Sequence, residues 1–333
     1  MAAPAPTSKA RQPLPEQLWI PLRGQVIARI SGPGTDRFLQ GQFSQDLKSV
    51  TLDNSPRAAA CNPKGRAYAL VRMVRHGEDV LVNLPTALAD ETLSHLRKYL
   101  MLFRGTTMTL EPEARVTGLL GDTLANDLLP DAASTLTEPG VTASIGAHRL
   151  IRTQDTAEGL SRFEFWQMEE MAGGQAEAFE PDTRGNEADW EASEIAAGVP
   201  WLTPETRESY VPQVLNWQHL DGIHFKKGCY TGQEVIARMH FLGQLKKSLF
   251  RLESRQAADL PSPGAGIMGE DRQAGEVVNA VMHTDGTLQM LAVLRHDAAR
   301  GELFLAGGEV PLFPLPLPYS VTEREKGEPA SDT

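Results

Sequence analysis

Residues 226–238 have the sequence KKGCYTGQEVIAR, and this stretch carries the strongest signal in the chain. It contains Cys229, one of only two cysteines, with Lys226 and Lys227 within three residues of the sulfur. Nearby ammonium groups favour a thiolate over a thiol. The stretch therefore predicts that Cys229 is more acidic than an ordinary cysteine, with Lys227 as a second catalytic candidate. The same pattern also fits a small residue in a tight turn, with lysines that only face solvent.

A helix is expected to follow Cys229. Thr231 and Glu234 have the spacing of a capping box, in which two side chains satisfy N–H groups at the start of a helix. An apolar run at helical spacing follows in residues 235–239. We therefore expect Cys229 to lie just before a helix N-terminus, whose dipole also favours a thiolate.

The composition is typical of a soluble globular protein that is long enough for two or three domains. The chain has 333 residues, of which 41% are hydrophobic and 23% are charged. No apolar run approaches the roughly 20 residues that a membrane-spanning helix needs. Residues 1–15 are rich in Ala and Pro and lack the apolar segment of a secretory signal. We expect a cytoplasmic protein with disordered tails at residues 1–15 and 326–333.

The cysteines and histidines do not predict a metal site. Cys61 and Cys229 are too few for the four thiolates that usually hold an iron–sulfur cluster, and no CxxC pair is present. Two cysteines also fit a reducing compartment better than a disulfide framework. The histidines show no HxxxH or HExxH spacing, and a lone one such as His219 or His224 is more often structural or exposed than a ligand. If the protein acts on clusters, we expect those clusters to belong to other proteins.

The charge distribution favours a small anionic ligand over a nucleic acid. A net charge of −11 opposes broad binding to a phosphate backbone, so direct nucleic-acid binding is not expected. A local basic patch around Cys229 remains an alternative, formed by Lys226, Lys227, Arg238, Lys246 and Lys247. Acidic residues concentrate elsewhere, at positions 169–194, which leaves the basic stretch free to attract an anion.

A β-hairpin followed by a helix is predicted in the first third of the chain. The mostly apolar residues 67–74 and 80–83 flank a turn at residues 76–79. Pro85 then introduces an amphipathic helix at residues 86–102. Two strands and a helix that covers one face of them predict a small α+β sandwich.

Trp190 lies in a predicted helix at residues 190–197, which Gly198 and Pro200 end. A tryptophan in a glutamate-rich helix is most often a core anchor. The alternative is an aromatic wall for a flat ring, because indole stacks on planar π systems.

The pattern changes near residues 243–249, where we place a domain boundary. Beyond it, short apolar segments alternate with glycine turns, and Asp285-Gly286 is a hairpin signal. Evenly spaced short strands of this kind predict a small β-barrel.

The stretch at residues 226–238 closely resembles the signature of the YgfZ family, folate-binding proteins related to the aminomethyltransferase of the glycine cleavage system. The resemblance runs from about residue 20 to about residue 325. Further blocks that resemble the family are residues 30–32 with 38–42, 61–66, 211–216 and 222–225.

The resemblance implies an aminomethyltransferase-like α+β fold. Two α/β, ferredoxin-like modules and a C-terminal β-barrel would surround a central hole that can take a tetrahydrofolate. In the related enzymes one domain is split by another, and we expect the same division here: a split folate-binding domain at 16–50 and 115–243, an inserted domain at 51–114 and the barrel at 244–325.

The resemblance also implies a set of site residues. Trp190 resembles a tryptophan that lines the folate site in the family, whereas Gln25 stands where family members can have a second one. The folate relatives hold the pterin with a carboxylate whose position the resemblance does not give, and Glu194 is available on the Trp190 helix. Lys226 or Lys227 are available as cations for the glutamate tail of the folate. No metal ligand is implied.

The function that the resemblance implies is binding of tetrahydrofolate or a derivative in support of the assembly or repair of iron–sulfur enzymes. These client enzymes would include those that thiomethylate tRNA, and Cys229 would act as the functional thiolate. Two alternatives stay open: a folate-dependent aminomethyl transferase, and a module that binds tRNA or protein without folate. Whether the protein turns over a substrate is not implied by the sequence.

Overall fold

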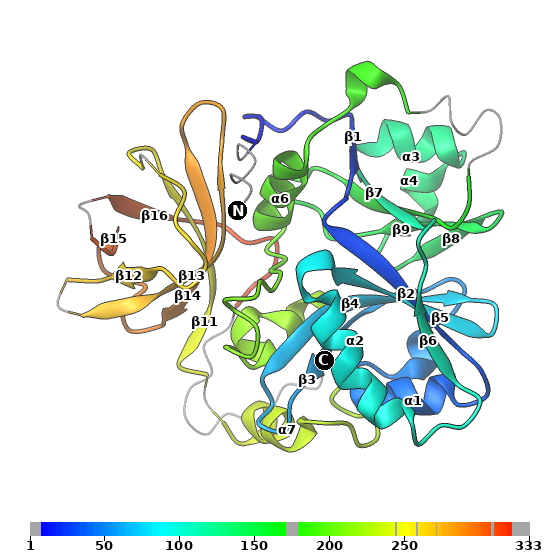
Figure 1. Cartoon of the computed structure of the whole chain (residues 1–333). Helices are drawn as coiled ribbons and strands as arrows, with labels where there is room; N and C mark the ends of the chain where they lie inside the picture. The colour runs from blue at the N-terminus through cyan, green and yellow to red at the C-terminus, as the bar shows by residue number, and fades with distance from the viewer. Residues whose placement is uncertain are drawn as a thin grey trace, which may run out of the picture.

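The computed structural model describes residues 8–170, 179–243, 245–257, 259–270, 272–307 and 310–321. Within these residues the chain forms two five-stranded sheets and a closed six-stranded barrel (Figure 1). This is the α+β architecture that the resemblance implied. No helix in the described ranges has both the length and the apolar character needed to span a membrane. The expected tail at residues 326–333 lies outside the described residues.

The first sheet has the strand order β1-β7-β10-β9-β8, and all of its pairs are antiparallel. Its strands and the helices that cover its outer face are β1 (Leu18–Pro21), β7 (Arg115–Leu120), β8 (Thr142–Ile145), β9 (His148–Arg152), β10 (Arg162–Gln167), α3 (Asp122–Leu128) and α4 (Ala132–Thr135). Leu124 and Leu128 of α3 pack on Phe163 and Leu150 of the sheet, which forms the core of this layer.

The second sheet has the strand order β3-β4-β5-β2-β6 and is also antiparallel. Its elements are β2 (Gln25–Ser31), α1 (Thr35–Gln42), a short 3-10 helix η1 (Leu47–Ser49), β3 (Arg57–Cys61), β4 (Ala67–His76), β5 (Asp79–Pro85), α2 (Thr86–Leu100) and β6 (Thr107–Leu110). The predicted hairpin and helix are thus confirmed as β4, β5 and α2.

The two sheets stack face to face because β2 is apolar on both sides. Side chains alternate along a strand, so Ile27 points to one face and Ala28 and Ile30 to the other. Ala28 and Ile30 pack with α1 and α2, whereas Ile27 packs with Ile20 and Ile151 of the first sheet. The described chain therefore places the two sheets between two layers of helices.

The barrel has the strand order β11-β14-β13-β12-β15-β16. Its strands are β11 (Lys247–Ser254), β12 (Gly266–Met268), β13 (Gln273–Met282), β14 (Leu288–Arg295), β15 (Leu303–Leu305) and β16 (Pro311–Leu315). Leu252 and Met290 pack in one cluster inside the barrel, and Leu249 and Leu291, which alternate with them, pack in a different cluster outside it. The predicted C-terminal barrel is thereby confirmed.

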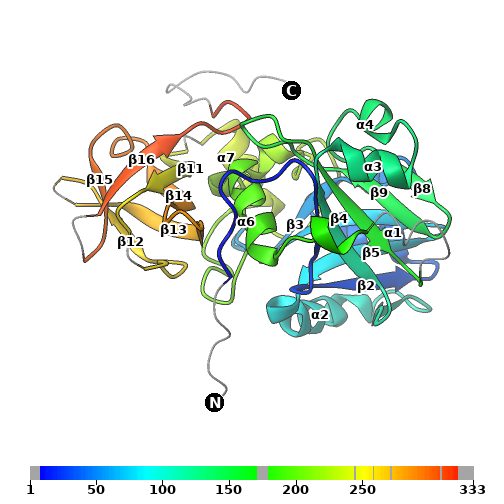
Figure 2. The ribbon, with the colours of Figure 1, turned by 90° about the horizontal axis from the view of Figure 1, so that it is seen from above.

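Helix α6 (Glu187–Ala196) lies between the barrel and the sheets (Figure 2). Asn186 and Asp189 form the capping box that starts it, with Asn186 Oδ1 accepting from Asp189 N at 3.1 Å and Asp189 Oδ2 accepting from Asn186 N at 2.9 Å. The sequence pattern placed the start of this helix at Trp190, whereas the structure shows that it begins at Glu187.

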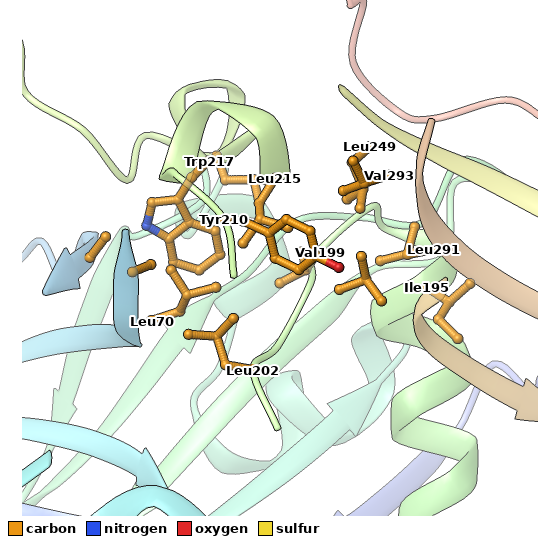
Figure 3. Packing of buried hydrophobic residues seen from close by; sticks show 14 of the residues in the cluster. Leu70, Ile195, Val199, Leu202, Tyr210, Leu215, Trp217, Leu249, Leu291 and Val293 are labelled. Atoms are coloured by element: carbon orange, nitrogen blue, oxygen red, sulfur yellow. The ribbon is translucent and has the colours of Figure 1, made fainter. Parts of the chain in front are cut away.

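A turn-rich segment after α6 joins the three parts of the molecule. It contains the 3-10 helices η3 (Pro212–Leu215) and η4 (Trp217–Leu220) and leads to α7 (Gln233–Phe241); η2 (Pro181–Thr183) precedes α6. Figure 3 shows Trp217 on the side of Leu70 in β4, and Ile195 of α6 near Leu291 of the barrel. One apolar cluster thus ties the second sheet, α6 and the barrel together.

Two expectations are corrected by the structure. Residues 8–15 are not a free tail, because Ala10 is fully buried and exchanges backbone hydrogen bonds with Met282 and Thr284 of the barrel region. Strand β2 was expected to share a domain with residues 115–243, but it pairs with β5 and β6, whereas β1 pairs with β7. The chain crosses from one sheet to the other after Pro21, and the limits of the other domains stay predictions.

Candidate functional site

A cavity of about 590 Å³ lies between the second sheet and α6. We call it the indole pocket, because Trp190, Trp201 and Trp217 all line it. Gln25 and Glu194 line it as well, so the structure brings together three of the residues that the sequence singled out. The volume falls within the range of about 300–1,000 Å³ that is typical of small-molecule sites.

The three tryptophans differ in how much of the indole ring is exposed. Trp190 is only 4% exposed, and its ring lies under the Arg162 guanidinium at 4.4 Å and against Gly118, where an added Cβ would stand 2.3 Å from Trp190 Cε3. Trp217 is also buried, and its Nε1 has no hydrogen-bond partner among the described residues. Trp201 is half-buried and offers the most accessible ring.

Trp201 was missed by the sequence analysis. Its backbone N donates to Asn279 Oδ1 at 3.1 Å and its carbonyl accepts from Asn279 Nδ2 at 3.0 Å, so the barrel holds the segment that carries it. This pair of hydrogen bonds joins two positions that lie far apart in the sequence, so the sequence did not show it. The only local signal for Trp201 was the turn at Pro200-Trp201 after α6.

A buried ion pair forms part of the wall of the indole pocket. Arg72 Nε and Nη2 donate to the two oxygens of Glu164 at 3.0 and 3.1 Å, and Trp166 Nε1 donates to Glu164 Oε2 at 3.0 Å. Burial opposes ionisation of Glu164, but Arg72 and Arg57 outweigh it and lower the pKa of Glu164 to about 2. The pocket therefore keeps a fixed carboxylate at neutral pH.

Arg57 adds a cation to the pocket. Among the described residues, no carboxylate forms a direct ion pair with it. Its Nη2 donates to Thr153 Oγ1 at 2.8 Å and its Nε to Gln154 Oε1 at 3.1 Å. Burial, and then the charge of Arg72, lower the pKa of Arg57 to about 10, so it still carries its charge at neutral pH. Its guanidinium carbon lies 5.7 Å from the centre of the Trp217 ring.

Glu194 has one oxygen engaged and one available. Glu194 Oε1 lies 2.8 Å from Nη2 of the fully buried Arg162. Glu194 Oε2 is buried and has no hydrogen-bond partner among the described residues. A buried carboxylate oxygen without a partner costs free energy unless a ligand donates to it, so this atom is a candidate contact for an N–H group.

Gln25 contributes an amide rather than a ring. Gln25 Oε1 accepts from Asn83 Nδ2 at 2.8 Å, and Asn83 Oδ1 accepts from Arg72 N at 2.7 Å. The side chain of Gln25 is therefore held in a polar network on the sheet side of the pocket.

Glu191 is an acid of the pocket that the sequence analysis did not single out. Burial, and then the neighbouring Glu187, raise the pKa of Glu191 to about 7. Glu187 Oε1 itself accepts from Gly24 N at 2.8 Å. Glu191 can therefore hold or release a proton near neutral pH.

We expect Glu191→Gln to stabilise the protein progressively as the pH rises from 5 to 8. A carboxyl whose pKa is higher in the folded chain contributes stability below its unfolded pKa, and that contribution is lost as the pH rises through about 7. The amide cannot ionise, so the variant should gain on the order of 1–2 kcal/mol over wild type across this range. Urea unfolding at both pH values measures the difference.

The exposed Glu234→Gln is the matched control for Glu191→Gln and should show no such trend. A difference between Glu191→Gln and wild type that stays constant with pH would contradict a raised pKa for Glu191.

The Cys229 loop lies outside the lining of the indole pocket. Cys229 is exposed, whereas Cys61 is buried at the end of β3 and its burial raises the pKa of its thiol. Gly232 packs beside Cys61, where an added Cβ would stand 3.0 Å from Cys61 Cβ and 2.6 Å from Asn62 O. The two family blocks at residues 61–66 and 226–238 are therefore in contact.

The capping box predicted from Thr231 and Glu234 is wrong. Helix α7 begins at Gln233, and Gly232 precedes it with φ +84° and no side-chain cap. A left-handed glycine at this turn, packed against Asn62, ends the loop instead. Cys229 thus lies four residues before the helix begins.

Lys227 and Lys226 differ sharply in their surroundings. Lys227 is buried, and its Nζ donates to the carbonyls of Gln40 at 2.7 Å and Phe43 at 2.5 Å at the end of α1. Burial lowers the pKa of Lys227 to about 8, against the opposing charge of Asp46. Lys226 is exposed, and neither lysine lines the indole pocket.

No protein-family model matches the sequence. The chain is 32% identical over 335 residues to the tRNA-modifying protein YgfZ of Cronobacter sakazakii. The matched residues cover 96% of this chain and 97% of that protein. It is 30% identical over 338 residues to the tRNA-modifying protein YgfZ of Yersinia pseudotuberculosis, with 97% of each chain covered. The fold is similar to the glycine cleavage system aminomethyltransferase T of Bartonella henselae, with a TM-score of 0.69 and 15% identity over 91% of this chain and 86% of that one.

Proposed function

The chain belongs to the YgfZ family of tRNA-modifying proteins, and from this premise we propose that its indole pocket binds tetrahydrofolate or a derivative. We further propose that it supports the assembly or repair of iron–sulfur enzymes, including those that thiomethylate tRNA. The observation that carries the proposal is the combination, in one pocket, of an accessible indole ring and an unpaired buried carboxylate oxygen, from Trp201 and Glu194.

The residues of the indole pocket fit a pterin ring. The pyrimidinone ring of the tetrahydrofolate pterin stays flat although the second ring is reduced, and it carries an amino group and an N–H group along one edge. Its face matches the ring of Trp201, and its donors match Glu194 Oε2. When bound, tetrahydrofolate would supply a carrier for a one-carbon group.

The other two tryptophans of the pocket would form its walls. Trp217 Nε1 is buried against Gly222, so Trp217 contributes the wall of its ring rather than a donor. Trp190 is held in place by Arg162 and Gly118, so it forms a rigid wall rather than a mobile stacking partner. Lys226 as a contact of the glutamate tail stays a prediction, because it does not line the pocket.

Cys229 is proposed as the functional thiol. It is the exposed cysteine of the two, so a client protein can reach it. After losing its proton to solvent, a surface thiol can transiently ligate an iron atom of a client cluster. Lys227 would act as a positioning residue, because its ammonium ties the Cys229 loop to the end of α1 through Gln40 and Phe43.

Folate-dependent aminomethyl transfer is a second candidate, which Glu191 favours. Acid–base work near neutral pH needs a group whose pKa lies near the working pH. Burial and Glu187 give Glu191 such a pKa, about 7, inside the indole pocket. Formation of a product from a tetrahydrofolate adduct by the purified protein would support this candidate.

The experiment that tests folate binding is a titration of the purified protein with tetrahydrofolate, followed by tryptophan fluorescence. We expect saturable quenching in wild type. Trp201→Ala removes the accessible ring and Glu194→Gln removes the charged acceptor, so each should weaken binding about tenfold or more. Trp201 is a safer target than Trp190, because a buried tryptophan is also needed for packing.

Trp19→Phe serves as the control, because Trp19 does not line the indole pocket and its Nε1 donates to Glu180 O instead. This variant should bind as wild type does. The absence of saturable quenching in wild type, with folded protein, would contradict folate binding and favour a module that binds tRNA or protein alone.

A further inference from the structure

A second cavity, of about 610 Å³, lies on the opposite side of α6 from the indole pocket. Trp190 and Glu194 of α6 line the indole pocket, whereas Ala192 and Ala196 line this second cavity. At about 100° per residue these two pairs fall on opposite faces of the helix. We call the second cavity the barrel pocket, because Arg251, His283 and Gln289 from the barrel region form its other wall.

The polar wall of the barrel pocket continues an apolar face of the barrel. Side chains two residues apart in a strand point to the same face. Arg251 therefore lies on the same face of β11 as Leu249, and Gln289 lies on the same face of β14 as Leu291. Leu249 and Leu291 are covered in the apolar cluster of Figure 3. Arg251 and Gln289 extend the same face beyond that cluster, where small alanines on α6 leave room.

Arg251 presents one unused donor. Its side chain is 3% exposed; Nη1 donates to Glu158 Oε1 at 2.6 Å and Nη2 donates to Gln289 Oε1 at 3.1 Å. Its Nε is buried and has no hydrogen-bond partner among the described residues. A buried guanidinium N–H without a partner is matched best by an anionic oxygen.

His283 presents an unused acceptor. It is 1% exposed, and its Nδ1 lies 3.1 Å from the carbonyl oxygen of Arg11. A carbonyl only accepts, so Nδ1 carries the hydrogen of this contact, and in the corresponding tautomer Nε2 holds the lone pair. His283 Nε2 is buried without a partner in the part of the chain that the structure describes. This lone pair can accept a hydrogen bond from a ligand, and a positively charged donor would give the strongest one.

The remaining charges of the barrel pocket are acidic. Glu16, Asp122 and Glu158 line it and are exposed, and Glu158 is already paired with Arg251. They would repel a phosphate, whose oxygens would also face the lone pair of His283. They would attract an ammonium group. The pocket thus offers one cationic donor, Arg251, and a set of groups that favour a positively charged donor.

We propose that the barrel pocket binds a free α-amino acid. The ligand carboxylate accepts from Arg251 Nε, and its ammonium group donates to His283 Nε2 and faces the exposed carboxylates. The cavity of about 610 Å³ leaves room for the side chain. This binding is separate from folate binding, because the two pockets use opposite faces of α6.

Thermal-shift screening of the full-length protein against each proteinogenic L-amino acid, followed by calorimetry, tests the proposal. We expect at least one amino acid to bind with a stoichiometry of one per chain. Its N-acetyl derivative lacks the ammonium group and its amide lacks the carboxylate, so each should bind about tenfold more weakly or worse. Inorganic phosphate should not bind.

Two variants locate the site. Arg251→Gln removes the cation, and Ala196→Leu fills the pocket from α6 while leaving Arg251 in place, so both should abolish binding. Arg272→Gln, which removes an exposed arginine paired with Asp297 on the barrel surface, should bind as wild type does. Circular dichroism and the tetrahydrofolate titration check that each variant is folded.

Three results would overturn the proposal. The first is that no amino acid binds wild type at millimolar concentration. The second is that the N-acetyl derivative or phosphate binds as well as the amino acid, which would indicate a plain anion site. The third is that binding survives both Arg251→Gln and Ala196→Leu in folded protein. None of these results bears on the proposed folate site, since its titration is measured separately.

Discussion

Replacing Arg72 by methionine is expected to lower the free energy of unfolding by about 3–5 kcal/mol. The side chains of Arg72 and Glu164 are 1% and 5% exposed, so neither charge has water to replace a lost partner. Arg72 also donates from Nη1 to Ser55 O at 2.8 Å and from Nη2 to Thr153 Oγ1 at 3.1 Å. Its loss leaves a buried carboxylate without its cation and Ser55 O without this donor, whereas Thr153 Oγ1 still accepts from Arg57.

Urea unfolding at pH 7 measures the effect of Arg72→Met. The double variant Arg72→Met with Glu164→Leu should recover part of the loss, because it removes the unpaired charge as well. Arg272→Met breaks an exposed pair and should change stability by less than about 1 kcal/mol. A loss for Arg72→Met no larger than that of Arg272→Met would show that the buried pair is not needed.

The same pair predicts how wild type responds to acid. The pKa of Glu164 is held at about 2, below its ordinary value of 4.5, so its contribution to stability is present above about pH 4.5. That contribution is lost as the pH falls through the interval between these values. Wild type should therefore lose stability toward pH 2, and Glu164→Gln should lose less over the same range.

Replacing Cys229 by alanine is expected to abolish the cellular function while leaving the fold intact. Cys229 is exposed, so the substitution removes no buried contact and should change stability by less than about 0.5 kcal/mol. The proposed contact with a client cluster depends on its sulfur. The measurement is the level of thiomethylated nucleosides in tRNA from cells that carry only the variant protein.

Cys61→Ala is the matched control for Cys229→Ala. Cys61 is fully buried in the apolar cluster that ties the second sheet, α6 and the barrel together, so its truncation should cost about 1 kcal/mol of stability but spare the function. Normal thiomethylation with Cys229→Ala would remove this thiol from the proposed mechanism. Loss of thiomethylation with a folded Cys61→Ala would show that the buried sulfur takes part.

Local elements were predictable where the chemistry is local. The turn at residues 76–79 and Pro85 marked β4, β5 and the start of α2, because turn residues act within a few positions. The capping box at Thr231 failed for the opposite reason. Contact of Gly232 with Cys61 and Asn62, which lie in another part of the chain, favours a left-handed glycine before α7.

The candidate site was predictable only in part. Gln25 and Trp190 were identified through the family resemblance and Glu194 as a carboxylate on the same helix as Trp190, and all three line one pocket. Trp201 and Trp217 were not identified, because a tryptophan in a turn-rich segment has no pattern that separates a pocket wall from a core residue. Lys227 was a catalytic candidate, and the structure shows that its Nζ donates to the carbonyls of Gln40 in α1 and of Phe43 directly after it.

The sequence by itself determined the family, the hairpin with its helix and the barrel, because signatures, turns and strand patterns depend on neighbouring residues. Only the tertiary structure decided that α6 separates two cavities, that Arg72 is buried with Glu164, and that Cys229 lies outside the indole pocket. The physical reason is that a pocket and a buried charge pair form where distant segments meet. Their energies depend on which groups are removed from water together, and the order of residues along the chain does not encode that directly.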